Sequence, residues 1–458
     1  MKITKKQIEN VKTVLLNVLV VTSLFLTWQI WTYEPDYEQE VAPTEASPVG
    51  VSEVNISDVV KPNQVVYHKD NQHFTSFYSE TIDTFYNLFV SGMKIKSFTM
   101  ENDIESLIDT DNSVELIFPT LLSNDVLKKL VSISKSDIPL TSFDRIIIPS
   151  VSTGKNNEII FLNTSSQKGM RATVDASADM KKWFSETFAS FNINNDKAGE
   201  LKFSRAKSAH LSKNSPTFYI PIQGQTVGIY GDSTDELANE EAFKEALFPE
   251  QDRVKKNTFN ISDLYTDGSR DLTFNDDSEY MIFKNPPSNP SSFDANEAPI
   301  LNAYGFINKH YGFRITNYDD EYVLNEWVRS SEKETDQITF RLNTEGYPVF
   351  SSSVEDLDEI NVTLENNEVS TYKRMLKVIQ YAKQTDERRL PGYSEVLTLL
   401  EDGSFKESEI QNITLGFTID RSLDQSEDFD FTLVPQWYVK VDQKWTPLQS
   451  ISNEQGGN

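Results

Sequence analysis

The sequence contains no cysteine among its 458 residues. Disulfide bonds, thiolate metal sites and cysteine nucleophiles are therefore excluded. Histidine is scarce, with four residues, and the excess of acidic over basic side chains gives a formal net charge of −27. Nucleic acid and anionic lipid carry charge of the same sign, so we expect neither as a ligand. The acidic composition is instead typical of a solvated protein surface.

The motifs of common catalytic and cofactor sites are also missing. No HExxH pattern, GxSxG nucleophile elbow, P-loop or dinucleotide-binding glycine pattern occurs. A carboxylate pair of the glycosidase type remains open, because many such pairs can be drawn from 70 acidic residues. No pair stands out. We therefore expect a protein that is not an enzyme and has no cofactor and no metal ion.

Two groups of residues nevertheless resemble metal ligands. His68 and His73 lie five positions apart; a metal-binding pair is possible, but we expect solvent-exposed residues of a polar loop. Acidic residues gather between 267 and 279 without the ligand order of an EF-hand loop. Turn chemistry explains Asp267-Gly268 without a metal. The remaining acidic residues of this cluster are Asp271, Asp276, Asp277 and Glu279.

An apolar run near the N-terminus predicts a membrane anchor. Residues 14–31 carry no formal charge, lysines precede them, and acidic residues follow them. This charge asymmetry predicts a cytoplasmic tail over 1–13 and a transmembrane helix over 14–32. The rest of the chain would then lie outside the cytoplasm. A cleaved signal peptide is the alternative, but the run ends in aromatic residues without a small-residue cleavage site.

The remaining chain predicts an α+β ectodomain of antiparallel sheets with packed helices. A linker over 33–60 precedes an N-terminal domain over 61–198, which has aromatic helix stripes at 77–89 and 180–191 and strands near 114, 145 and 157. A central domain over 199–310 begins with a strand pair around Gly224. Ser233 and Glu236 have the spacing of a capping box before its first helix. A C-terminal domain over 311–452 follows.

The last two domains show weak internal repetition. Two predicted hairpins correspond, LTFNDDSEYMIF at 272–283 and VTLENNEVSTY at 362–372. Each is followed by a predicted helix, at 297–309 and near 393–400, and the exits YGFRI at 311–315 and LGFTI at 415–419 also correspond. The repetition predicts two related α+β domains rather than one large sheet.

Several motifs together resemble the YycH (WalH) family of Gram-positive bacteria. The most specific is the anchor and its exit, KTVLLNVLVVTSLFLTWQIWTYEPDYE at 12–38. Three shorter pieces follow in the family's order: YTDGSRDLTF at 265–274, GYPVF at 346–350 and PQWY at 435–438. The resemblance covers the whole chain.

This resemblance implies a function. Members of the family are membrane-anchored regulators of the sensor histidine kinase WalK, which controls cell-wall metabolism through WalR, and they act with a sister protein, YycI. The last two domains would resemble YycI. By the same resemblance, the span would contact the kinase, and its polar or interfacial residues Asn17, Thr27 and Trp28 are the candidate partner-binding residues. An extracytoplasmic ligand-sensing module and a wall-active enzyme are the competing classes.

Overall fold

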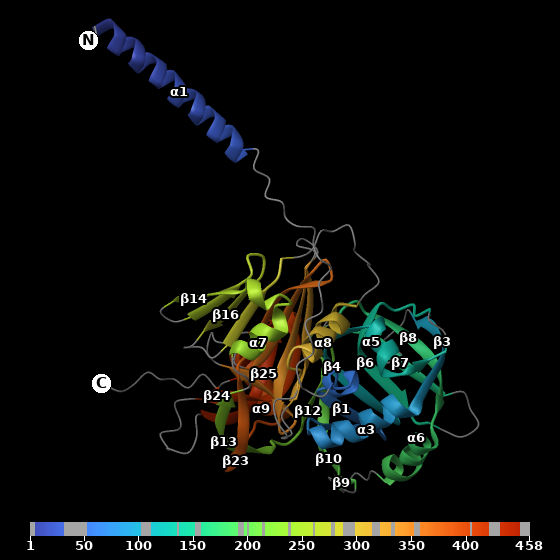
Figure 1. The fold of residues 1–458 in the computed structure, drawn as a ribbon. Coiled ribbons are helices and arrows are strands. Elements are labelled where there is room, and N and C mark those ends of the chain that lie inside the picture. The colour runs from blue at the N-terminus through green and yellow to red at the C-terminus, as the bar shows by residue number, and fades with distance from the viewer. Residues whose placement is uncertain are drawn as a thin grey trace, which may run out of the picture. The chain divides into compact units, whose positions relative to one another are not determined.

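The computed structural model describes most of the chain and divides it into two units, Met1–Glu45 and Ala46–Asn458. The described residues are 5–31, 53–101, 111–134, 137–151, 157–190, 197–198, 201–212, 216–236, 240–259, 262–275, 280–286, 298–313, 321–330, 335–351, 358–403, 405–420 and 431–448. The second unit is rich in sheet (Figure 1). The predicted α+β class is confirmed.

The first sheet has ten strands in the order β12-β11-β2-β1-β4-β6-β7-β8-β3-β5. All neighbours in it are antiparallel except the pair β3–β5. The two-stranded β9–β10 ribbon lies between β8 and β11 in the chain. The strand bounds are β1 (Gln64–Lys69), β2 (Gln72–Ser76), β3 (Met93–Glu101), β4 (Ser113–Ser123), β5 (Ser132–Ile133), β6 (Ser142–Pro149), β7 (Asn157–Asn163), β8 (Lys168–Ala176), β9 (Lys197–Ala198), β10 (Leu201–Lys202), β11 (Ser204–Ala209) and β12 (Phe218–Pro221).

Aromatic helix faces cover one side of this sheet. Helix α3 (Ser79–Gly92) buries Phe85 and Phe89, as the apolar stripe of the sequence predicts. It meets the helix α6 (Ala178–Trp183), which continues as a π-helical turn at Phe184–Phe188. The rings of Phe85 and Trp183 lie 4.7 Å apart. Two further short helices, α2 (Ile56–Val59) and α5 (Asn124–Leu130), belong to the same part of the chain.

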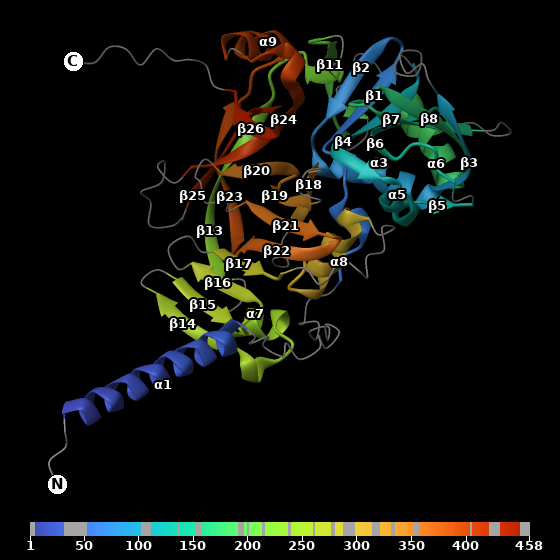
Figure 2. The same cartoon turned by 90° about the horizontal axis from the view of Figure 1, so that it is seen from above.

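The second sheet has fourteen strands (Figure 2). Its main path runs β14-β15-β16-β17-β22-β21-β19-β20-β24-β25-β13-β23, while β18 pairs with β19 and β26 with β25. The bounds are β13 (Thr226–Glu236), β14 (Lys255–Phe259), β15 (Ser262–Thr266), β16 (Asp271–Asn275), β17 (Tyr280–Lys284), β18 (Glu321–Ser330), β19 (Thr335–Thr344), β20 (Tyr347–Ser351), β21 (Glu359–Glu365), β22 (Glu368–Met375), β23 (Lys377–Arg389), β24 (Ile410–Asp420), β25 (Phe431–Val441) and β26 (Lys444–Pro447).

Most local elements predicted for this region are present. Helices α7 (Glu240–Leu247), α8 (Pro299–Lys309) and α9 (Tyr393–Asp402) lie where apolar periodicity predicts them. The two predicted hairpins form, as β16–β17 and β21–β22. Asn366 and Asn367 have φ values of 51° and 69° at the second turn, the conformation of a two-residue hairpin loop. Strands of both predicted domains join in one sheet, because β17 pairs with β22, so the expectation of separate sheets rather than one large sheet is wrong. The bounds of the three predicted units and the likeness of the last two stay predictions.

Two predictions around the start of the second sheet are wrong. The strands on either side of Gly224 do not pair with each other, because β12 pairs with β11 of the first sheet and β13 pairs with β23 and β25 of the second. Ser233 and Glu236 form no capping box, since both lie within β13. Pairing with strands far along the chain overrides the local helix signal at these positions.

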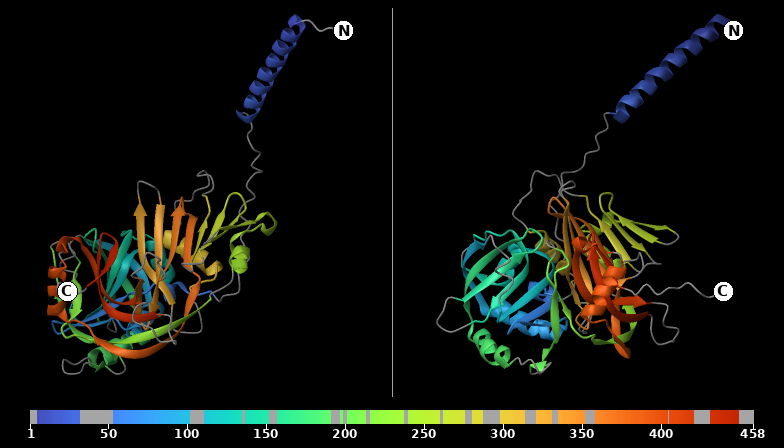
Figure 3. Two further views of the ribbon diagram at one scale, coloured as in Figure 1. Left: turned by 90° about the vertical axis from the view of Figure 1, so that its left-hand side faces the viewer. Right: turned by 180° about the vertical axis from the view of Figure 1, so that it is seen from behind.

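The two sheets are joined by close contacts. The β19–β20 turn packs on α3, and a Cβ added at Gly346 would lie 2.5 Å from the backbone nitrogen of Ser79. The rings of Phe77 and Trp437 meet edge to face at 5.7 Å. The indole nitrogen of Trp437 also donates to the carbonyl of Pro391 at 2.9 Å. Figure 3 shows the first sheet (blue to green) beside the orange and red strands of the second.

The N-terminal unit contains helix α1 (Lys5–Trp31), which begins earlier than the predicted span of 14–32. Within the described part of the chain, no helix meets the combined requirement of length and apolar character for crossing a membrane. Most of the predicted tail, 5–13, belongs to the same helix, and the predicted linker falls largely outside the described residues.

Candidate functional site

The three predicted partner-binding residues all lie on α1. Asn17 and Trp28 are exposed, Trp28 to 62%. The Thr27 hydroxyl donates to the carbonyl of Ser23 at 2.8 Å within the helix, so its proton is already engaged. The ring of Trp28 lies 6.0 Å from that of Phe25. No contact with a partner is tested, and these assignments stay predictions.

The first sheet holds a second buried layer on the face away from α3. Residues two apart on a strand share a face, and the strand registers bring together the side chains of Val66, Ile117, Ala206 and Tyr219 as one buried cluster. Beside it Ile147, Ile160 and Leu162 form another. Both faces of the sheet are therefore buried around its middle strands.

Four polar side chains form a chain within this layer. His68 on β1 and His73 on β2 lie opposite each other, with their Nδ1 atoms 2.8 Å apart. The Nε2 of His68 lies 3.0 Å from Glu115 Oε2. Arg145 Nη1 donates to the other oxygen of Glu115 at 2.8 Å, and Arg145 Nη2 donates to the carbonyl of Thr217 at 2.6 Å. The side chains of Glu115 and Arg145 are 1% and 5% exposed.

The pKa of Glu115 shows which charge state this chain of contacts favours. Burial alone would raise the pKa of the carboxyl, but the charge of Arg145 and the bond to His68 outweigh burial and lower it from 4.5 to about 2. The carboxylate is therefore the stable form in the folded protein. Because a carboxylate only accepts, His68 Nε2 donates to Glu115, and of the two facing Nδ1 atoms one donates and the other accepts.

This arrangement corrects the expectation for the two histidines. His68 is buried and part of a strand rather than an exposed loop residue. The sequence holds a signal that could have revealed it. Asp70 and Asn71 have φ values of 53° and 58°, and an Asp-Asn pair between alternating apolar residues is typical of a two-residue hairpin loop. Nothing in the sequence around Glu115 or Arg145 indicates that these two side chains pair with each other.

Acid should weaken the fold through Glu115. Its pKa is lower in the folded than in the unfolded state, so its contribution to stability is complete above pH 4.5 and declines as the pH falls from 4.5 to about 2. We expect a loss of roughly 3 kcal/mol over this range. Denaturant unfolding at successive pH values would measure it. Glu115→Gln should flatten the pH dependence, whereas Glu158→Gln, at a half-exposed pair with Arg171, should not; equal slopes would contradict the assignment.

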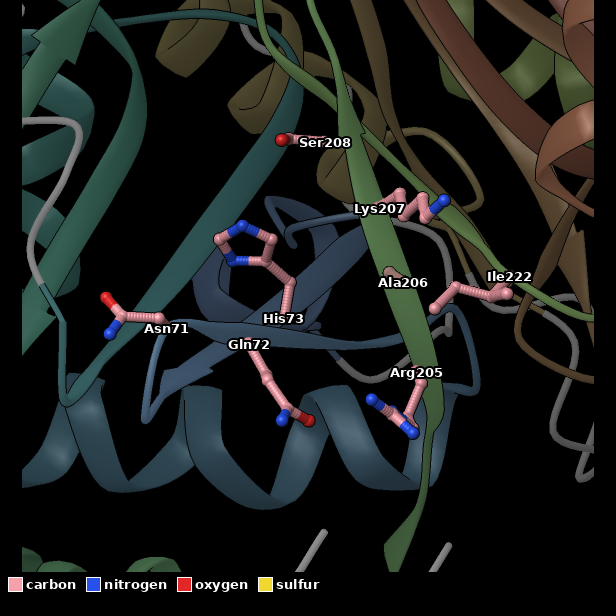
Figure 4. Close-up of a pocket in the computed structure, with 8 residues that line it drawn as sticks. All are labelled: Asn71, Gln72, His73, Arg205, Ala206, Lys207, Ser208 and Ile222. Carbon is pink, nitrogen blue, oxygen red and sulfur yellow. The ribbon is translucent and has the colours of Figure 1, made fainter.

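Beside His73 the layer opens into a pocket of about 270 Å³. Figure 4 shows Arg205 and Lys207 projecting from β11, with Gln72 and His73 on the neighbouring strand β2. A larger cavity of about 650 Å³ lies at the contact between the sheets, lined by Lys202 of β10, Tyr347 of β20 and the connector from β12 to β13. Arg205 and Ile222 line both cavities.

The structure gives no metal-binding cluster of three or more histidine, aspartate or glutamate side chains within its described residues. Asp267 instead accepts hydrogen bonds from the backbone of Ser269 and Arg270 at 2.9 and 2.7 Å. Gly268, which follows Asp267 in this turn, has a φ of +96°. The predicted turn chemistry is confirmed there. Asp276, Asp277 and Glu279 lie outside the described residues.

Comparison with known proteins places the chain in a family. The profile "YycH protein, N-terminal domain" matches residues 9–187, and "YycH protein, C-terminal domain" matches residues 216–455. The "Two-component system WalR/WalK regulatory protein YycH" of Bacillus subtilis (strain 168) is 25% identical over 477 residues, which cover 98% of each protein.

The fold agrees with a solved structure. The crystal structure of YycH from Bacillus subtilis superposes with a TM-score of 0.68 at 19% identity, over 87% of this chain and 98% of that chain. Since the matches extend over both halves of the sequence, the likeness is not confined to one sheet. The chain belongs to the YycH family.

Proposed function

We propose that this protein regulates a sensor histidine kinase of the WalK type and thereby controls cell-wall metabolism. It acts from the extracytoplasmic side, held to the membrane by residues 14–32, together with a YycI-like sister protein. It has no catalytic activity of its own. One observation carries the proposal: a regulatory protein of the WalR/WalK system aligns with this chain over 98% of both lengths.

The membrane part of the proposal rests on the sequence. Lys2, Lys5, Lys6 and Lys12 precede the apolar run, and Glu34 and Asp36 follow it, the asymmetry that keeps the basic end in the cytoplasm. With this orientation, both sheets lie outside the cytoplasm. The kinase and the YycI-like protein would then be reached through the span and through the ectodomain surface.

Regulation requires a difference in binding free energy. A kinase that alternates between two conformations responds to a partner only if the partner binds one of them more tightly. A side chain that can hydrogen-bond a neighbouring helix supplies such a difference when its acceptor is present in one state alone. Asn17 suits this role because amide side chains bond across helices within membranes.

The first test is co-purification from detergent-solubilised membranes. The full chain is compared with one in which residues 14–31 are replaced by an unrelated apolar span. We expect the kinase to co-purify with the native chain and to be lost on the exchange. A YycI-like protein that binds the ectodomain should be retained by both. Failure of the kinase to co-purify with either chain would refute the proposed contact.

A single substitution tests the role of Asn17. Asn17→Leu removes a hydrogen bond worth about 0.6–2 kcal/mol. We therefore expect the equilibrium constant for pairing with the kinase helix to fall by roughly three- to thirtyfold, and kinase output to change with it. Transcription from a WalR-type promoter would report it. Thr22→Val is the matched control, because the Thr22 hydroxyl already donates to the Val18 carbonyl at 2.8 Å. Equal kinase output from both variants at equal expression would exclude Asn17 as a contact with the kinase.

A further inference from the structure

One stretch of this acidic protein is basic. Residues 201–231 contain no aspartate or glutamate, although the whole sequence has 70 acidic against 43 basic residues. Near its start lie Lys202, at the end of β10, and Arg205 and Lys207 on β11. All three side chains are exposed. The sign of the local charge is therefore opposite to that of the protein as a whole.

These three cations lack the partners that other cations have. Lys61 lies 3.3 Å from Asp83 and 2.5 Å from Glu321. By contrast, Lys202, Arg205 and Lys207 form no ion pair with any residue that the structure describes. The ammonium of Lys202 lies 4.1 Å from the centre of the Tyr78 ring, and that of Lys207 lies 5.4 Å from the Tyr393 ring. A ring holds the cation without neutralising it.

The same cations line both cavities, the pocket beside His73 and the larger cavity at the contact between the sheets. Lys202 and Arg205 border the cavity of about 650 Å³, and Arg205 and Lys207 border the one of about 270 Å³. Among the described residues that line them, neither cavity has an acidic side chain. The larger cavity is within the range that binds small molecules, which is about 300–1,000 Å³.

The walls of the larger cavity are fixed by backbone contacts. The backbone nitrogen of Lys202 donates to Thr81 Oγ1 of α3 at 3.0 Å. Ile222 N donates to the carbonyl of Arg205 at 2.7 Å. Further along the same connector, Leu390 N donates to the carbonyl of Gln225 at 2.7 Å, and a Cβ at Gly224 would lie 2.2 Å from the Leu390 oxygen. The site is therefore formed before any ligand binds.

We propose that Lys202, Arg205 and Lys207 form a binding site for a polyanion that carries two or more linked phosphate groups. The planar guanidinium of Arg205 matches two oxygens of one phosphate. Lys207 shares its face of β11 two residues on, about 7 Å away, which a second phosphate of the same molecule can reach. Ser204 and Gln223 line the larger cavity and supply neutral donors. This site goes beyond the proposed kinase regulation and does not depend on it.

Calorimetric titration of the full chain in detergent would test the site. The probe is sodium tripolyphosphate at low ionic strength, with orthophosphate and a short polyglutamate for comparison. We expect tripolyphosphate to bind more tightly than either, and its affinity to fall as salt is added. Equal affinity for orthophosphate would overturn the requirement for linked phosphates. Equal affinity for polyglutamate would overturn the choice of phosphate.

Charge-reversed variants locate the binding. Arg205→Glu with Lys207→Glu should weaken tripolyphosphate binding by roughly tenfold or more. Lys94→Glu with Lys168→Glu makes the same charge change at exposed lysines of β3 and β8, outside both cavities, and should alter affinity by about twofold at most. The neutral pair Arg205→Gln and Lys207→Gln must also lose affinity. Equal losses in the control and site variants, or none in the site variants, would overturn the proposal.

Discussion

Replacing Arg145 by methionine will lower the free energy of unfolding by about 3–5 kcal/mol. The side chain keeps much of its volume, but Glu115 loses its 2.8 Å partner and keeps only His68 to offset the burial of its charge. The carbonyl of Thr217 loses its donor as well. Denaturant unfolding of the purified protein would measure the change. Arg171→Met is the matched control, because the Arg171–Glu101 pair is about one-third exposed, and we expect it to cost about 0–1 kcal/mol.

The double variant gives the sharper outcome. If the cost of Arg145→Met comes from stranding a buried charge, then adding Glu115→Met removes that charge and restores stability to within about 1–2 kcal/mol of the wild type. The two substitutions should therefore be strongly non-additive. A double variant as unstable as the sum of the two single variants would show that packing, rather than charge, dominates this site.

Gly346→Ala should be the second most damaging single change. Gly346 has φ +83°, a conformation that costs an alanine roughly 1–2 kcal/mol. The added methyl would also meet Ser79 N at 2.5 Å and Ser79 Cβ at 2.6 Å. Neither atom is the end of a flexible side chain, so α3 or the β19–β20 turn must move, at a further cost of about 1–3 kcal/mol. We expect a lower melting temperature and faster proteolysis.

Gly268→Ala separates the two contributions to that loss. Gly268 also has a positive φ, +96°, but nothing lies within 4 Å of an added Cβ. It should therefore show the backbone cost alone, about 1–2 kcal/mol. If both variants lose the same stability, the close approach of the β19–β20 turn to α3 contributes nothing, and the contact between the sheets is looser than the packing indicates.

Elements that are determined by local sequence were predicted well. The stripe that includes Phe85 and Phe89 forms α3, and the Asn366-Asn367 turn forms a hairpin, because helix periodicity and turn conformation depend on neighbours along the chain. The acidic turn at Asp267 was also interpreted correctly. The family resemblance, drawn mainly from the N-terminal run, is confirmed by matches over both halves of the chain.

Features that depend on distant pairing were not predicted. Ser233 has local helix signals but lies in β13, whose partner β23 is far along the chain. The polar chain joins His68, Glu115 and Arg145 from three strands. The register in which these strands pair cannot be predicted from a single sequence. The larger of the two cavities beside Arg205 depends on the contact between two sheets. Periodicity shows which face a residue occupies, but not what lies opposite that face.

The pairing of β13 also sets the order in which the protein can complete its fold. During synthesis every strand of the first sheet has left the ribosome once β12 has emerged, so that sheet can form early. Strand β13 follows at once, but its partners β23 and β25 are among the last segments to appear. Until then β13 has open edges that another chain could pair with. A chain stopped before β25 would therefore be a substrate for chaperones and proteases, however well its first half had folded.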